Sequence, residues 1–196
     1  MQTILNTRVV IISVEAILFS SFIWALVWWF KDSRNVKRWE LHFIKISGML
    51  FILFHLISAC LYPLPSIAVS TIGIVLLLIS GLLFISSLLS FKRPPGIAFG
   101  EKLIVELNTS GPYKFIRHPF YTSYSLAWIG GTIATGCWWL IMSFIVMIFV
   151  YYKAAKEEEL TWLKSKDAQK YEEYARHTGM FMININYIIK RSSQVL

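Results

Sequence analysis

Long apolar blocks dominate the first half of the chain. Three of them, at residues 9–30, 43–62 and 66–91, contain few charged side chains. Each is long enough to cross a hydrocarbon core of about 30 Å, because a helical span needs about 20 residues. The pattern therefore predicts three membrane-spanning helices before the middle of the chain.

A fourth apolar block covers residues 119–152 and is too long for one ordinary span. Gly136 interrupts it and is followed by Cys137, so we interpret the block as two helices that turn at this point. The spans would be residues 119–135 and 138–152. With the three earlier blocks, this predicts an all-α integral membrane protein with five transmembrane helices.

Two polar segments flank this last pair of spans. Residues 92–118 form a longer connection than two helices require, and long ordered loops are usually functional. Within it, the apolar run LIVEL, residues 103–107, is compatible with a strand or a helical turn. Residues 153–178 are typical of an amphipathic helix interrupted near residues 165–167. That helix would either lie on the membrane surface or close over the preceding loop.

Composition and charge support a membrane protein with a defined orientation. The chain is 56% hydrophobic and 15% charged, and its 196 residues suit a single domain, 1–196. With the N-terminus outside, the inner segments 31–42, 92–118 and 153–196 hold seventeen of the nineteen Lys and Arg residues. Since cytoplasmic loops collect Lys and Arg, the C-terminus is predicted to be cytoplasmic. This orientation also accounts for the net charge of +8 without a nucleic-acid partner.

The first span differs from a signal peptide, because its apolar stretch is too long and basic residues follow it. Cys60 and Cys137 both fall at predicted outer helix ends, where either a disulfide or two buried thiols is compatible with the sequence. No zinc-ligand spacing is present, so no metal site is predicted.

Most of the candidate chemistry lies in GPYKFIRHPFYTSY, residues 111–124. Pro119 disfavours helical geometry at His118 but fits the first position of a helix, so His118 should stand just before a helix begins. Arg117, Tyr113 and Tyr121 would surround this helix N-terminus. Backbone N–H groups and the helix dipole favour an anionic ligand group there.

The order G-P-Y, aromatic, R-H-P-x-Y in this segment resembles the isoprenylcysteine carboxyl methyltransferase family and the related membrane phospholipid methyltransferases. Two later segments agree in order and distance. KEEELTWL, residues 156–163, is similar to the acidic motif of the family, and YEEYARHTGMF, residues 171–181, is similar to its closing segment. The resemblance covers roughly residues 90–185.

This resemblance implies a cytoplasmic pocket for S-adenosylmethionine, built from residues 92–124 and 153–181 and closed by the C-terminal amphipathic helix. The cofactor contacts that it implies are Leu107, Asn108, Tyr113, His118, Pro119, Tyr121 and Glu158, with Glu157 as an adjacent candidate. The catalytic positions that it implies are Arg117, His118 and Lys153.

These residue types suit the functional groups of the cofactor. Methyl transfer from a sulfonium needs positioning and exclusion of water rather than a covalent nucleophile. His118 at a helix N-terminus suits a carboxylate, tyrosine rings can face a cation, and a glutamate can accept hydrogen bonds from ribose hydroxyls. Each residue also has an ordinary structural interpretation: a helix cap for His118, interfacial anchors for the tyrosines, and a solvated face for the glutamates.

The acceptor implied by the resemblance is lipid-like or prenylcysteine-like. The family has an Arg before the acidic run that is implicated in handling the acceptor carboxylate, whereas this chain has Lys153 and Lys156. Lysine lacks the bidentate fork of arginine, so the departure weakens the prenylcysteine interpretation most.

Two other functions are compatible with the sequence. One is a non-catalytic membrane subunit on the same scaffold. The other is a haem-binding electron carrier that uses His42 and His55, although His118 and His177 would then lie on the cytoplasmic side, away from one of the haems.

Overall fold

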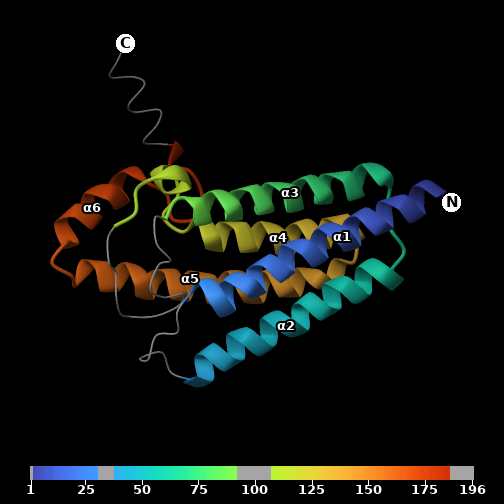
Figure 1. The fold of residues 1–196 in the computed structure, drawn as a ribbon, viewed down its shortest axis with the longest axis horizontal. Helices are drawn as coiled ribbons and strands as arrows, with labels where there is room; N and C mark the ends of the chain where they lie inside the picture. Colours follow the sequence, from blue (N-terminus) through green and yellow to red (C-terminus); the bar gives the residue numbers. More distant parts are fainter. Residues whose placement is uncertain (1, 31–37, 92–106, 186–196) are drawn as a thin grey trace, which may run out of the picture.

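The computed structural model describes residues 2–30, 38–91 and 107–185, and it is built from helices (Figure 1). No strand longer than an isolated bridge occurs within these three ranges. The elements are α1 (Gln2–Trp24), the π-helical η1 (Ala25–Trp29), α2 (Arg38–Leu61), α3 (Ile67–Leu89), the 3₁₀ turn η2 (Gly111–Lys114), α4 (Pro119–Thr135), the 3₁₀ turn η3 (Trp138–Leu140), α5 (Ile141–Leu163) and α6 (Ala168–His177).

A helix is found at each of the five predicted spans. Three helical stretches, Gln2–Trp29, Ile67–Leu89 and Trp138–Leu163, are long and apolar enough to cross a membrane. The apolar part of α2, Lys45–Leu61, and the 17 residues of α4 are shorter. The described part of the chain is therefore helical and contains three helices of membrane-spanning length.

The predicted breaks between helices are confirmed. Gly136 ends α4 in the left-handed region at φ 66°, where glycine is favoured because it has no Cβ. α5 ends at Leu163 and α6 begins at Ala168, so the interruption near residues 165–167 is also present. Most of the LIVEL segment lies outside the described residues.

α3 and α4 approach each other closely. A Cβ on Gly73 would stand 2.2 Å from the backbone nitrogen of Ala134. Farther along the contact, Ser80 Oγ–H donates to the Ser123 carbonyl at 2.7 Å, and Ser123 Oγ–H donates to the Ser80 carbonyl at 2.9 Å. Small residues thus let two backbones approach closely, as is common between membrane helices.

The helices α1 to α5 run along the long axis of the molecule, and η2 and α6 lie together at one end (Figure 1). The start of α4 and the end of α5 both reach this end. At the opposite end, Cys60 is exposed and Cys137 is buried, and both are free thiols. The end that carries η2 and α6 therefore brings the two polar segments of the sequence together.

Candidate active site

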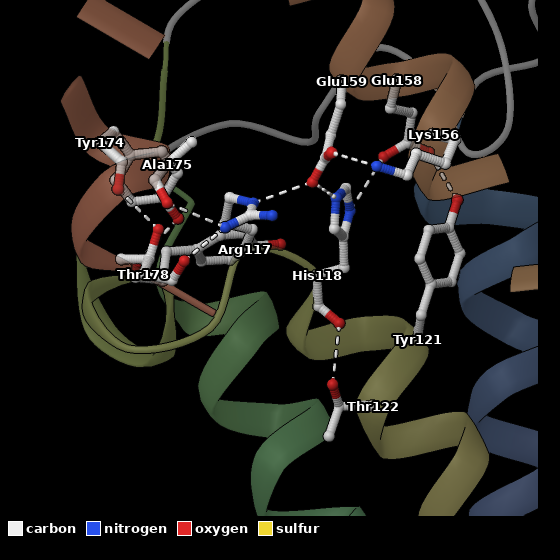
Figure 2. A network of polar contacts seen from close by, with 11 residues as sticks. Arg117, His118, Tyr121, Thr122, Lys156, Glu158, Glu159, Tyr174, Ala175 and Thr178 are labelled. Atoms are coloured by element: carbon white, nitrogen blue, oxygen red, sulfur yellow. Dashed lines mark hydrogen bonds and ion pairs between the residues drawn. The ribbon is translucent and has the colours of Figure 1, made fainter. Parts of the chain in front are cut away.

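His118 lies between two carboxylates at the start of α4 (Figure 2). Its Nδ1 is 3.4 Å from Glu158 Oε2, and its Nε2 is 3.3 Å from Glu159 Oε1. Pro119 occupies the first helical position and is buried, and His118 is the N-cap with φ −124°, as predicted. The imidazole makes no hydrogen bond to the backbone of the helix end. His118 therefore contacts the acidic motif, and its side chain is not a helix cap.

Glu158 joins the two halves of the predicted site. Its Oε1 accepts a hydrogen bond of 2.5 Å from the Tyr121 hydroxyl, while its Oε2 faces His118. The Tyr121 ring is buried, and it is stacked on Tyr151 with ring centres 5.4 Å apart. Tyr121 is consequently part of the helix packing and not an interfacial anchor.

Arg117 holds the C-terminal segment against this cluster. Its Nε–H donates to Glu159 Oε1 at 2.8 Å, and a terminal N–H group donates to the carbonyls of Ala175 and Thr178 (Figure 2). The guanidinium is largely buried. These contacts give Arg117 a positioning role that the sequence alone did not suggest.

The backbone before α4 is paired with the segment that follows α6. Ile116 forms a parallel bridge with Gly179. The Arg117 N–H donates to the Gly179 carbonyl at 2.8 Å, and the His118 N–H donates to the Met180 carbonyl at 3.1 Å. The motif at residues 171–181 is therefore placed directly beside the motif at residues 111–124.

α6 packs on the protein through its aromatic side chains. The Tyr174 hydroxyl donates to the Tyr113 carbonyl at 2.8 Å, and the Tyr171 ring is stacked on Trp162 with centres 5.7 Å apart. Of the two arrangements compatible with the sequence, the structure favours closure over the preceding loop.

The remaining predicted residues are less central. Asn108 Nδ2–H donates to the Ser90 carbonyl at 3.1 Å, which fixes the loop to the end of α3. Leu107 is half-buried, whereas Lys153 and Glu157 are exposed on α5. The structure thus groups His118, Tyr121 and Glu158, but it does not bring these other side chains into the same cluster.

Glu159 is the residue that sequence reasoning missed. It is buried and contacts both Arg117 and His118, and its Oε2 is 3.7 Å from Lys156 Nζ. A signal was present: Tyr151 and Ala155 are buried on α5, and Glu159 continues their spacing of four residues. Extending that buried face would have selected Glu159 from the three consecutive glutamates.

The two carboxylates determine the charge of His118. Burial alone would lower the pKa of this imidazole, but the hydrogen bonds and negative charges of Glu158 and Glu159 outweigh it and raise the pKa. Burial and the charge of Glu158 raise the pKa of Tyr113 well above its ordinary value, so this phenol stays protonated. The two carboxylates that flank His118 thus favour its protonated form.

The haem interpretation finds no support at His55. Its Nδ1 is 3.4 Å from Glu15 Oε1 and its Nε2 is 2.9 Å from Ser143 Oγ, so both ring nitrogens are engaged within the protein. The side chain of His42 lies outside the described residues.

Comparison with known protein families places this site in context. Residues 67–166, slightly more than half of the chain, match the family model described as phospholipid methyltransferase. The chain belongs to the phospholipid methyltransferase family of membrane proteins. No curated protein matches the chain. The matched region contains His118, Tyr121 and all three glutamates of the acidic motif.

Proposed function

We propose that this protein transfers the methyl group of S-adenosylmethionine to a lipid-like acceptor at the cytoplasmic face of a membrane. The observation that carries the proposal is the position of Glu158, whose two oxygens contact Tyr121 and His118 at the start of α4. Membership of the phospholipid methyltransferase family supports the reaction class.

The residues fit the proposed cofactor. An ionised carboxylate offers about four lone-pair sites, so Glu158 keeps acceptor capacity for ribose hydroxyls beside its two protein contacts. The side chain of Glu158 is 30% exposed, which leaves it open to a ligand. The N-terminus of α4, which begins at Pro119 directly after His118, offers partial positive charge to a carboxylate.

S-adenosylmethionine supplies a methyl group already activated by its sulfonium. The work left for the chain is to bind, to orient and to exclude water. His118 and Glu158 would bind and orient, while Arg117 and Tyr174 hold α6 and the segment after it over the cluster. No side chain is required to form a covalent bond.

The orientation and the acceptor are parts of the same proposal. The distribution of Lys and Arg supports five spans, including α4 and the short apolar part of α2, with the N-terminus outside. Lys153 and Lys156 replace the arginine expected for a prenylcysteine carboxylate, and Lys156 is 3.7 Å from Glu159. These features favour a lipid acceptor over a prenylcysteine.

The test is calorimetric binding of S-adenosylhomocysteine to the detergent-purified protein. Glu158→Gln and Tyr121→Phe should each weaken binding about tenfold or more, since each removes a contact of a charged group. Glu172→Gln, on the exposed side of α6, is the matched control and should bind like the wild type. Absence of binding to a folded wild type would reject the cofactor, and the non-catalytic interpretation would replace it.

A second assay identifies the acceptor. Purified protein is incubated with methyl-labelled donor and either phospholipid vesicles or a prenylcysteine in detergent. Label in the phospholipid fraction supports the proposal, whereas label on the prenylcysteine alone would contradict the acceptor class.

A further inference from the structure

A second polar cluster lies inside the helix bundle, away from the candidate active site. Glu15 of α1 and His55 of α2 are completely buried, with Glu15 Oε1 3.4 Å from His55 Nδ1. Ser143 of α5 is 2.9 Å from His55 Nε2. Ionisable groups at membrane depth are costly and mark functional positions. The proposed methyl transfer makes no direct use of them.

The hydrogen-bond directions show which ring nitrogen of His55 donates to Ser143. The Ser143 hydroxyl donates to the Leu140 carbonyl at 2.6 Å, so its oxygen accepts from His55 Nε2–H. His55 Nδ1 then faces Glu15 Oε1 at 3.4 Å. The same directions argue against a nucleophilic serine, because the hydroxyl proton of Ser143 points away from the imidazole.

α4 lies directly over this pair because Gly131 has no side chain. A Cβ at Gly131 would stand 2.3 Å from Glu15 Oε1 and 2.5 Å from His55 Nδ1. Trp128, one turn earlier on α4, has its ring centre 5.3 Å from that of His55. The pair therefore determines the position of this turn of α4 and of the Trp128 indole.

A chain of buried contacts leads from Trp128 to the candidate active site. The indole N–H of Trp128 donates to the Tyr151 hydroxyl at 3.0 Å. The Tyr151 ring is stacked on Tyr121 at an interplanar angle of 10°, and the Tyr121 hydroxyl donates to Glu158. Each link from Trp128 to Tyr121 is a packed ring or a hydrogen bond between buried groups, and such groups have little freedom to move independently.

We propose that Glu15 and His55 are positioning residues for the methyl-transfer site, acting through Trp128 and Tyr151 on the ring of Tyr121. This inference rests on the proposed function, because it assigns a reaction-related role to residues distant from Glu158. It predicts that changes in the membrane interior alter cofactor affinity at the end of the bundle.

The first test compares S-adenosylhomocysteine affinity in matched variants. Glu15→Ala should raise the dissociation constant about threefold to tenfold. Glu15→Gln should have a smaller effect, because its amide N–H can still donate to His55 Nδ1. Ser70→Ala is the control: Ser70 is buried and donates to the Ala134 carbonyl of α4 at 3.0 Å, but it does not belong to the contact chain. An equal loss of affinity in Ser70→Ala would overturn the proposal.

A double-mutant cycle tests the route. If Glu15 acts through Trp128 and Tyr151, the double variant Glu15→Ala/Tyr151→Phe should raise the dissociation constant by less than the product of the two single-variant fold-changes. A fold-change in the double variant equal to that product would overturn the route.

A readout without cofactor separates this inference from the proposed function. In protein labelled with 5-fluorotryptophan, the ¹⁹F resonance of Trp128, assigned with Trp128→Phe, should shift in Glu15→Ala and stay in place in Ser70→Ala. An unshifted resonance in Glu15→Ala would overturn the positioning role. If the wild type binds no S-adenosylhomocysteine, the cofactor proposal fails, while this measurement still decides whether Glu15 positions Trp128.

Discussion

Arg117 Nε–H donates to Glu159 Oε1 over 2.8 Å, although the two residues are 42 positions apart in the chain. This contact joins the start of α4 to the end of α5. The same guanidinium also donates to carbonyls at the end of α6, so one side chain connects three helices. The arrangement shows that three separate sequence motifs each supply one side of a single cluster.

Replacing Arg117 by lysine should loosen the closing segment. Lysine keeps the charge but not the planar fork that reaches Glu159, Ala175 and Thr178 together. We expect a loss of stability of about 1–3 kcal/mol and faster proteolysis in the turn at residues 164–167. Limited proteolysis of Arg117→Lys beside Arg176→Lys, which alters an exposed position, checks this. Equal cleavage rates in the two variants would contradict the assigned role.

The raised pKa of His118 makes the stability of this end of the molecule depend on pH. The stabilising contribution is complete below the unfolded-state pKa of about 6.5 and is lost as pH rises through the higher folded-state pKa. The melting temperature should therefore fall more steeply above neutral pH in the wild type than in His118→Asn. His177→Asn, on the exposed side of α6, should keep the wild-type slope. Equal slopes of melting temperature against pH in the wild type and His118→Asn would contradict a stabilising contribution from protonated His118.

Tyr174→Phe should destabilise the closure of α6. The hydroxyl donates to the Tyr113 carbonyl, and loss of one such hydrogen bond costs about 1 kcal/mol. Tyr152→Phe removes an equivalent hydroxyl from an exposed position on α5 and should have little effect. Thermal unfolding of both variants in the same detergent measures the difference, and an equal effect would show that the Tyr174 contact does not stabilise the closed form.

Gly73→Ala should separate α3 from α4. The added methyl would meet the backbone of Ala134, and overpacking of this kind costs about 1–3 kcal/mol. Gly48→Ala is the matched change in α2, where a Cβ meets nothing within 4 Å and better helix propensity should stabilise by up to about 1 kcal/mol. Opposite shifts in melting temperature are expected. A neutral Gly73→Ala would contradict the tight contact.

Much of the helical framework is predictable from local signals. Apolar blocks locate the five long helices, Gly136 marks one turn, and Pro119 marks the start of α4. These features can be predicted from neighbouring residues alone, because apolar runs and the backbone preferences of glycine and proline act over a few positions.

Long-range pairing limits prediction of the site. Nothing local shows that Ile116 pairs with Gly179, or that Glu159, rather than Glu157, turns towards Arg117. Successive residues on a helix point about 100° apart, so the packing of α5 decides which of three adjacent glutamates is buried. The motif order indicates that the segments meet, but only the folded chain shows which atoms touch.

The bridge between Ile116 and Gly179 has a consequence for biosynthesis. The ribosome makes residues 179 and 180 after all five apolar helices, so the carbonyls that accept from the backbone N–H groups of Arg117 and His118 are synthesised after the bundle. A nascent chain arrested before residue 179 would carry the helical bundle without its closing segment. Insertion into the membrane and completion of the candidate active site are therefore separate events in time.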